Sequence, residues 1–288
     1  MYKLRIQMVL YKNTIPQLRT SLDSVILATK AVSKNFQIVL GSNSCDITMN
    51  RKYVNLVQEY SDKVAIEIHC SQENIGHGAM HNKLFFEAFE ESELLLIINP
   101  DGIIGPTSLS TMVNLITPKD VGAVEPRQLP FEHPKKFDIT TGETSWASGA
   151  CLLTKSAIFE KLKGFDKRFF LHCDDVDLSW RIRNQGLKLI YSAESRFFHD
   201  KTVAKNGHPE TSESESFYGP LGALLIAHKY NLKKGLKYML QDLGKSTDVL
   251  HKEILKAYTS QSATLSTLQI APEIPKYINP WKFSETKY

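Results

Sequence analysis

Short apolar runs and helical repeats alternate through the first third of the chain. The run at 94–98 is wholly apolar, which is typical of a strand buried on both faces of a parallel sheet. After Pro16, which suits the first turn of a helix, apolar residues recur at helical spacing. Strands are predicted at 4–11, 36–40, 64–69 and 94–98, and helices at 16–31, at 51–60 and from the 74–82 turn to 90. This alternation predicts βαβ units and an open parallel α/β sheet.

Three polar turns follow these predicted strands, at 41–46, 74–82 and 99–102. In open sheets of this kind, ligands bind outside the carboxyl ends of the strands. Within the second turn, Gly76 and Gly78 allow close approach of the backbone, and the helix that follows favours a phosphate at its N-terminus. The spacing is neither a P-loop nor a GxGxxG motif, so this turn alone does not specify a nucleotide site.

The second half of the chain has a less regular pattern. Its expected strands lie at 121–124, 146–153, 187–191 and 196–198, with a helix at 156–162 and a charged loop or hairpin at 125–143. After a polar loop at 201–216, two helices are predicted at 217–230 and 232–257. An irregular tail with Pro272, Pro275 and Pro280 follows.

Acidic side chains are concentrated in one short stretch, residues 169–181, where a helix is predicted to begin. Asp174, Asp175 and Asp177 fall close together, and Asp174 or Asp175 suits the N-cap of that helix. The helix end keeps nearby carboxylates ionised, and an ionised carboxylate at a pocket mouth can take a proton from a hydroxyl. The alternative is an ordinary capped helix in which Asp177 pairs with Arg181 one turn later.

Two further positions are candidates for binding a divalent cation. Asp101 follows the wholly apolar strand, and His199 closes the last predicted strand. A carboxylate there suits Mg²⁺ or Mn²⁺, which would neutralise a departing diphosphate. Each residue also has an ordinary structural explanation, a strand-ending turn for Asp101 and a structural histidine for His199.

Composition and charge exclude some classes of protein. The formal net charge of +4 argues against broad nucleic-acid binding and permits a phosphate-bearing ligand. The four cysteines show no CxxC spacing, so neither a zinc module nor a disulfide framework is indicated, and a reduced, cytoplasmic setting is expected. We expect neither a signal peptide nor a spanning helix, since no apolar run approaches roughly 20 residues.

Taken in order, these residues resemble the motifs of the family 2 glycosyltransferases, especially the rhamnosyltransferase-like members that build bacterial surface polysaccharides. The resemblance covers roughly residues 4–200, and the order of the motifs makes it specific. The matching segments are Met8-Val9-Leu10-Tyr11-Lys12-Asn13, Asn74-Ile75-Gly76-His77-Gly78 with Asn82, Asn99-Pro100-Asp101, Trp146-Ala147-Ser148-Gly149-Ala150, Gly164-Phe165-Asp166-Lys167-Arg168-Phe169-Phe170, Asp174-Asp175-Val176-Asp177-Leu178 and His199.

The resemblance implies a GT-A-type fold, in which a Rossmann-like, mixed but mainly parallel sheet is flanked by helices and followed by C-terminal helices. It implies a catalytic domain over 1–215, with a nucleotide-sugar half at about 1–102 and an acceptor half at about 103–215. A C-terminal helical region and tail would occupy 216–288.

The resemblance also implies an inverting sugar transfer from a nucleotide-diphosphate donor, dTDP-rhamnose or a UDP-sugar, to a saccharide or lipid-linked saccharide. Asp175 would act as the base with Asp174 beside it, and Asp101 and His199 would hold Mg²⁺ or Mn²⁺. The donor would contact Tyr11, Asn43, Asn74, Gly76, Asn82, Asn99 and Asp101. The acceptor would contact Trp146, Gly149 and Asp177.

One departure from the family concerns the end of the second strand. Gly41-Ser42 stand where the family usually has an Asp-Asn pair whose Asp touches the nucleotide base, and only Asn43-Ser44 keep the pattern. The identity of the nucleotide therefore stays open. This departure also supports the alternative hypothesis, a non-catalytic nucleotide-sugar-binding or scaffold protein on the same fold.

The predicted C-terminal helices carry several lysines beside apolar residues. This pattern fits two explanations equally well. The lysines could contact anionic lipid at the inner face of the cytoplasmic membrane, or they could form a solvated face on helices that pack against the catalytic domain. The lysines are Lys229, Lys233, Lys234, Lys237 and Lys245.

Overall fold

Four parallel strands form the first half of the sheet. A computed structural model of the chain describes residues 2–87, 91–133, 135–201, 210 and 212–267, and the expected tail beyond 267 lies outside them. The strands follow the order β3 (Ala65–Cys70), β2 (Phe36–Ser42), β1 (Leu4–Leu10) and β4 (Leu94–Ile98). The helices between them are α1 (Ile15–Lys30), α2 (Ile47–Tyr60) and α3 (His77–Phe86). The predicted βαβ pattern is confirmed here.

Local capping explains where two of these helices begin. Thr14 and Gln17 form a reciprocal capping box at the start of α1. The Asp46 side chain accepts hydrogen bonds from the backbone N–H groups of Thr48 and Met49, so α2 begins four residues before the predicted position.

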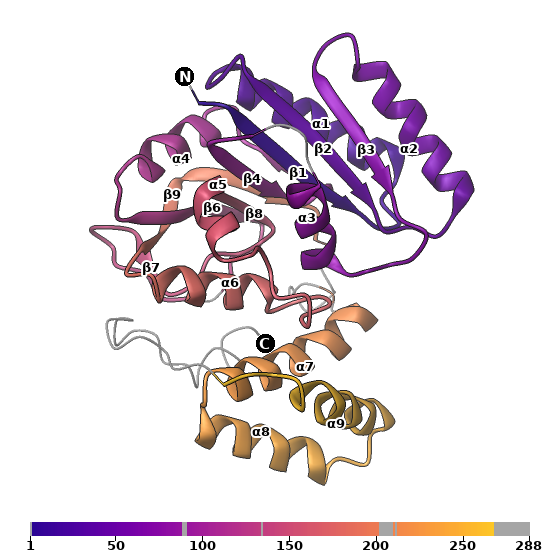
Figure 1. The fold of residues 1–288 in the computed structure, drawn as a ribbon, viewed down its shortest axis with the longest axis vertical. Helices are drawn as coiled ribbons and strands as arrows, with labels where there is room; N and C mark the ends of the chain where they lie inside the picture. Colours follow the sequence, from indigo (N-terminus) through magenta and orange to yellow (C-terminus); the bar gives the residue numbers. More distant parts are fainter. Residues whose placement is uncertain (1, 88–90, 134, 202–209, 211, 268–288) are drawn as a thin grey trace.

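The second half of the sheet is mixed. The strand order continues from β4 through β8 (Cys151–Lys155), β6 (Val121–Leu129), β9 (Lys188–His199) and β5 (Gly102–Ile104), and β7 (Glu143–Thr144) pairs with β9. The helices of this half are α4 (Ser108–Ile116), α5 (Ser156–Lys161) and α6 (Asp174–Arg183). The mixed sheet flanked by helices is the predicted fold class (Figure 1).

Three predictions for this half were wrong. The strand predicted at 121–124 continues to Leu129. Pro126 does not end the strand, because it falls at a register shift of the β6–β9 pairing, where a missing N–H is tolerated. The two strands predicted after 187 are one strand, β9. The segment 146–150 is not a strand, since its backbone N–H groups donate to side chains instead of a neighbouring strand.

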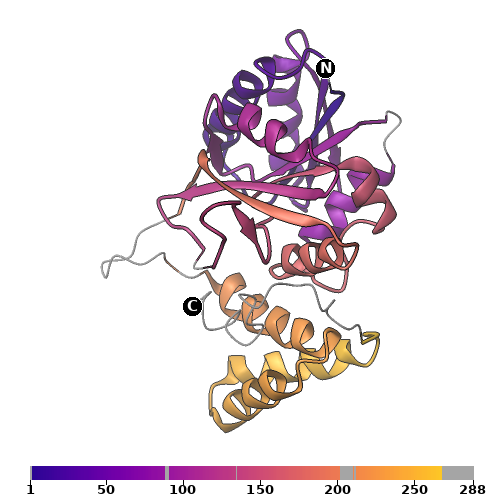
Figure 2. The same cartoon turned by 90° about the vertical axis from the view of Figure 1, so that its left-hand side faces the viewer.

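Apolar side chains are buried on both faces of the sheet. Ile6 and Met8 of β1 belong to the core shared with α1, α2 and α4, whereas Leu95 and Ile97 of β4 pack with residues of α5 and α6. Because successive strand residues point to opposite faces, one strand can supply both cores. The result is a three-layer arrangement of helices, sheet and helices (Figure 2).

The C-terminal region forms three helices, α7 (Glu213–Lys229), α8 (Lys233–Lys245) and α9 (Val249–Ser262), where two were predicted. The break between α8 and α9 is stabilised by Asp248, whose side chain accepts from the backbone N–H of Leu250. These helices pack below the sheet domain through a core that includes Trp146, Phe169 and Trp180 (Figure 1). Within the described residues, none of the helices is long and apolar enough to cross a bilayer.

Candidate active site

The turn that carries Asp101 lies near the acidic stretch, just beyond the paired ends of β4 and β8. β4 pairs with β8, and just beyond that pairing the backbone N–H of Asn99 donates to the carbonyl of Ala150 over 2.8 Å. The next residue toward the N-terminus, Gly149, donates its backbone N–H to Asp175 over 3.0 Å. The sheet therefore brings Asn99, which begins the Asn99–Asp101 turn, close to the Asp175 carboxylate.

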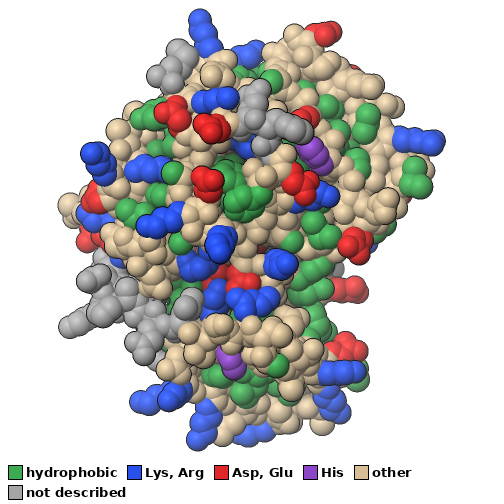
Figure 3. Space-filling view, in the orientation of Figure 1, with side chains coloured by type: hydrophobic (Ala, Val, Ile, Leu, Met, Phe, Trp, Pro, Cys, Tyr) green, Lys and Arg blue, Asp and Glu red, His purple; other side chains and the backbone are tan. Residues whose placement is uncertain are grey.

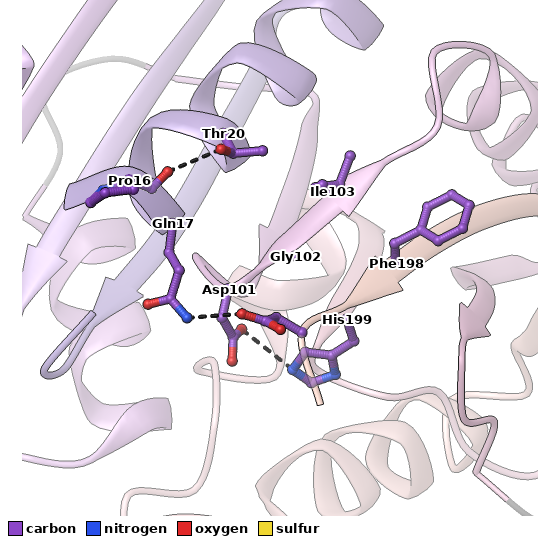
Figure 4. A pocket seen from close by; sticks show the side chains of 9 residues that line it. Pro16, Gln17, Thr20, Asp101, Gly102, Ile103, Phe198 and His199 are labelled. Carbon is purple, nitrogen blue, oxygen red and sulfur yellow. Dashed lines mark hydrogen bonds and ion pairs between the residues drawn. The ribbon is translucent and has the colours of Figure 1, made fainter. Parts of the chain in front are cut away.

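Asp101 and His199 face each other beside a cavity of about 410 Å³ (Figure 4). His199 Nε2 lies 3.3 Å from Asp101 Oδ1, and its other ring nitrogen lies 3.4 Å from the side-chain oxygen of Gln128. β5 and β9 bring the pair together, because Gly102 is aligned with His199 in their antiparallel pairing. Gln17 and Asp200 also line the cavity, linked by a 2.9 Å hydrogen bond.

The Asp101 carboxylate is suited to a cation. Burial acts to raise its pKa, but the contact with His199 outweighs burial and the pKa lies below its usual value. The buried Oδ1 atom, which faces His199 at 3.3 Å, has no other polar partner among the described residues. No three Asp, Glu, His or Cys side chains of the described part converge as metal ligands. Two protein ligands nonetheless fit Mg²⁺ or Mn²⁺, which keep waters and substrate phosphates in their coordination.

Asp174 is held by a histidine that sequence reasoning left without a role. Its Oδ2 atom lies 2.7 Å from His77 Nδ1, and the Asp174 side chain is 5% exposed. Burial acts to lower the pKa of His77, but the charges of Asp174 and Asp175 outweigh burial and raise it. Since His77 stands at the start of α3, in the 74–82 turn, it connects that turn to the acidic stretch.

Asp175 is oriented by two backbone groups. Oδ2 accepts from the N–H of Gly149, and Oδ1 accepts from the N–H of Val176 over 2.8 Å. A β-carbon at position 149 would lie 3.2 Å from Asp175 Cβ, so glycine allows the two backbones to approach. The predicted cap was wrong: α6 begins after Cys173 without a side-chain cap, and both carboxylates lie in the first turn.

Buried polar groups hold the segment Trp146–Ala150 in place beneath the carboxylates. The backbone N–H of Ser148 donates to Glu125 Oε2 over 2.9 Å, and that of Ala147 donates to the Ser179 hydroxyl. Glu125 forms a buried ion pair with Lys135, whose ammonium lies 4.2 Å from the centre of the Trp146 ring. Burial raises the pKa of Glu125 in spite of that pair. These two charged residues had no distinguishing motif in the sequence.

Relatives of known name support the resemblance seen in the sequence. The chain is 25% identical over 225 residues to the O-antigen biosynthesis protein RfbC of Myxococcus xanthus, covering 68% of this chain and 17% of that protein. It is 26% identical over 184 residues to the O-antigen chain rhamnosyltransferase WbaN of Salmonella anatum, covering 56% and 55%. An N-acetylglucosaminyl-diphospho-decaprenol L-rhamnosyltransferase of Mycobacterium tuberculosis matches at 27% over 119 residues, covering 40% and 38%.

Solved glycosyltransferases share the fold. A mannosyltransferase, PcManGT from Pyrobaculum calidifontis in complex with GDP-Man and Mn²⁺, aligns with a TM-score of 0.62 at 15% identity, covering 92% of this chain and 76% of that one. GalNAc-T7 with UDP, GalNAc and Mn²⁺ aligns with a TM-score of 0.64 at 13% identity, covering 92% and 56%. The chain has the GT-A fold, and its sequence is similar to those of rhamnosyltransferases and O-antigen biosynthesis proteins. No protein-family model matches it, and it spans 17 to 55% of the length of the three relatives named above.

Several of the expected donor residues line the carboxyl ends of the strands. Tyr11 follows β1 and is 47% exposed. The Asn43 amide donates to the Gly76 carbonyl over 3.0 Å, and the Asn74 side chain accepts from the Gly76 N–H. Asn82 instead engages the backbone N–H and carbonyl of Phe165, both over 2.8 Å, which ties α3 to the segment before α6. Donor contact stays a prediction for all of them.

The departure at Gly41 has a structural reason. A β-carbon there would lie 2.6 Å from Met80 Cγ and 3.0 Å from a Leu84 methyl, so α3 occupies the space of the acid found in the family. Gly41 is buried at the end of β2. An aspartate could not enter this position without displacing the side chains of Met80 and Leu84.

Asp177 lies in the interior. Its side chain is 0% exposed, and its carboxylate accepts from Arg181 over 2.8 Å and from the Tyr230 hydroxyl over 3.0 Å. The ammonium of Lys229 forms a further ion pair with the Asp177 carboxylate. The predicted Asp177–Arg181 pair is thus present, and in this conformation Asp177 reaches α7 and not a ligand. Trp146 is also buried, at 5% exposure, so its predicted acceptor contact would need the segment to open.

Proposed function

We propose that this protein is an inverting glycosyltransferase. It would move a sugar, rhamnose or a related hexose, from a nucleoside-diphosphate donor to a saccharide hydroxyl in bacterial surface polysaccharide synthesis. The observation that carries this proposal is the placement of Asp175, a carboxylate fixed by two backbone N–H groups beside the sheet edge that also presents Asp101 and His199. The similarity to two named rhamnosyltransferases supports the same function.

The proposed reaction is a single displacement. Asp175 accepts the proton of the acceptor hydroxyl while that oxygen forms a bond to the anomeric carbon of the donor sugar. The bond from the anomeric carbon to the diphosphate oxygen breaks on the opposite face, and the nucleoside diphosphate leaves with the bonding electrons. Attack from the face opposite to the leaving group inverts the anomeric configuration.

The fixed groups around Asp175 lower the barrier by positioning. Because Gly149 and Val176 hold one carboxylate oxygen each, the carboxylate needs little reorganisation when the acceptor arrives. Asp174, at the start of the same helix, pairs with His77 of α3, and the histidine partly balances the two acids. Mg²⁺ or Mn²⁺ held by Asp101 and His199 would supply positive charge for the diphosphate.

The C-terminal helices are proposed to touch anionic lipid through α8. Lys233, Lys234 and Lys237 are exposed on this helix, and Tyr238 beside them is 68% exposed. Figure 3 shows lysine and arginine side chains over the lower end of the molecule, where these helices lie. Lys229 does not belong to this surface, because its ammonium is buried and pairs with Asp166 and Asp177. A lipid-linked acceptor would explain such a surface.

Replacement of the base tests the catalytic proposal. We expect Asp175→Asn to lose at least a hundredfold in transfer rate, within the usual contribution of a general base. Binding of the nucleoside diphosphate, measured by calorimetry, is expected to stay within twofold of the wild type. Asp120→Asn is the matched control, since Asp120 pairs with Lys188 on the surface. Near wild-type turnover of Asp175→Asn would contradict the assignment of Asp175 as the base.

A further inference from the structure

Helix α7 lies along the segment that leads into α6. Tyr218, Gly222 and Lys229 of α7 each contact this segment, at Phe170, at Cys173 and at Asp166 and Asp177 respectively. Spacings of four and seven residues put the three on one face of a helix. α7 runs below α6 in Figure 1, and the packed core between them includes Phe169 and Trp180.

The turn beneath the two carboxylates has an unusual backbone. His172 and Cys173 both have φ of 62°, in the left-handed region that side chains other than glycine rarely adopt. Asp174 and Asp175 follow immediately. Cys173 stands at the N-cap without a capping hydrogen bond from its side chain. Such a conformation persists only where the surrounding structure imposes it.

Gly222 lets α7 lie directly on this turn. A β-carbon at position 222 would lie 2.9 Å from both Cβ and Sγ of Cys173 and 3.1 Å from the carbonyl oxygen of His172. Glycine in the middle of a helix weakens it relative to alanine. The close approach to Cys173 is therefore what the glycine at this position provides.

The two ends of α7 secure the same segment. The Tyr218 ring stacks on Phe170 at 4.9 Å, and the carbonyl of Phe170 accepts from the backbone N–H of His77 over 2.9 Å. At the other end, the Tyr230 hydroxyl just beyond α7 donates to Asp177 within α6. The contacts extend from the 74–82 turn to the first turns of α6.

We propose that α7 is a positioning element for the catalytic pair, with Gly222 as its central residue. By packing against the His172–Cys173 turn, α7 holds the first turn of α6 where Asp175 meets Gly149 and Asp174 meets His77. The inference rests on the proposed function only in taking Asp174 and Asp175 as the catalytic pair. The C-terminal helices are then part of the catalytic apparatus and not only an appendage.

The test compares Gly222→Ala with Gly244→Ala in the full chain. Position 244 on α8 has no atom within 4 Å of an added β-carbon, so it is the matched control. We expect Gly222→Ala to lower kcat at least tenfold and to leave the Kd of the nucleoside diphosphate within twofold, with Gly244→Ala unchanged in both. In the absence of substrate, the amides of residues 174–178 should exchange with deuterium at least tenfold faster in Gly222→Ala.

A second substitution provides a rescue. Cys173→Gly removes the two atoms nearest to an added methyl group at 222 and leaves only the His172 carbonyl oxygen at 3.1 Å, and glycine suits the positive φ. The double variant should recover most of the lost turnover and amide protection. A Gly222→Ala protein that matches Gly244→Ala in turnover and exchange would overturn the proposal, as would a double variant no better than Gly222→Ala.

Tyr230→Phe covers the case in which Gly222→Ala does not fold, because it keeps the ring and removes only the hydroxyl on Asp177. We expect at least a threefold loss of kcat and faster exchange at 174–178, whereas Tyr258→Phe, which loses a hydroxyl on His228, serves as control. No change in Tyr230→Phe would overturn the proposal. An inactive wild type would contradict the proposed function alone, and the exchange measurements would still decide this inference.

Discussion

At the scale of single residues, the site contains acid–histidine pairs in which a contact offsets the cost of burying a charge. Asp174 is buried and His77 is 17% exposed, and the charge of Asp174 offsets the cost of burying a charged His77. On the other side of the Asn99–Ala150 contact, burial acts to raise the pKa of Asp101, but the contact with His199 outweighs it and lowers that pKa. Each half of the proposed site therefore contains an acid whose partner comes from a distant part of the chain.

The raised pKa of His77 predicts a pH-dependent contribution to stability. The folded protein binds the histidine proton more tightly than the unfolded chain, so the contribution is complete below the ordinary pKa of 6.5 and is lost as pH rises through the higher folded value. At pH 6 we expect His77→Gln to cost roughly 1.5–3 kcal/mol of unfolding free energy, the usual contribution of a hydrogen bond to a charged group.

Urea unfolding of the wild type and His77→Gln from pH 6 to pH 9 measures this contribution. The difference between the two proteins should shrink as pH rises. His69→Gln is the matched control, because His69 is half exposed on β3 and only loosely paired with Glu67. A stability difference that stays constant across this range would contradict a charged His77.

At the scale of elements, α7 and α8 face different surroundings although both carry lysines. The Lys229 side chain is 4% exposed and links α7 to α6 through Asp166 and Asp177. Desolvation by burial would raise the pKa of Asp166, but Arg168 and Lys229 outweigh it and lower the pKa. The lysines of α8 are exposed and have no such role. Only α8 is therefore assigned to a lipid surface.

The exposed lysines of α8 predict salt-sensitive binding to anionic vesicles. Each charge near an anionic surface contributes about 1 kcal/mol, so replacing Lys233, Lys234 and Lys237 by glutamine should weaken binding roughly a hundredfold. Co-sedimentation with phosphatidylserine-containing vesicles measures this. A control variant with glutamine at Lys30, Lys52 and Lys63 removes the same charge from exposed positions of the sheet domain. Equal loss in both variants would leave only a net-charge effect and exclude an α8 surface.

At the scale of the whole molecule, the sheet domain carries both proposed substrate halves and the C-terminal helices support them from below (Figure 2). The acid usually found at position 41 is replaced by the packing of Met80 and Leu84. Uracil and thymine differ only by one methyl group, and no acid at position 41 contacts the base, so we expect UDP and dTDP to bind with similar affinity.

Thermal unfolding with UDP, dTDP, GDP and CMP, each with and without Mn²⁺, tests the assembled donor site. A nucleotide at a hundred times its Kd should stabilise the fold by about 2.7 kcal/mol, which corresponds to a rise in Tm of roughly 5–10 °C. We expect this rise with UDP and dTDP, dependent on Mn²⁺ and lost in Asp101→Asn. Absence of any shift in the wild type would make the non-catalytic hypothesis the better one.

Much of the fold was predictable because its signals are local. The strand and helix pattern of the first half depends on side-chain periodicity and turn residues within a few positions, and β1 to β4 follow it. The split between α8 and α9 also had a local signal, the capping residue Asp248, which the lysine-rich pattern obscured. The order of the motifs likewise determined the fold class and the resemblance to rhamnosyltransferases.

Only the tertiary structure decided how the site is held. His77 meets Asp174 across 97 positions of sequence, and Gly149 meets Asp175 across 26. The left-handed turn before α6 and the glycine that packs on it, Gly222 of α7, lie far apart in the sequence. Such contacts depend on strand order and on close packing of distant backbones, and neither leaves a periodic trace in the chain. The sequence thus determined which residues carry the chemistry, and packing decided which neighbours orient them.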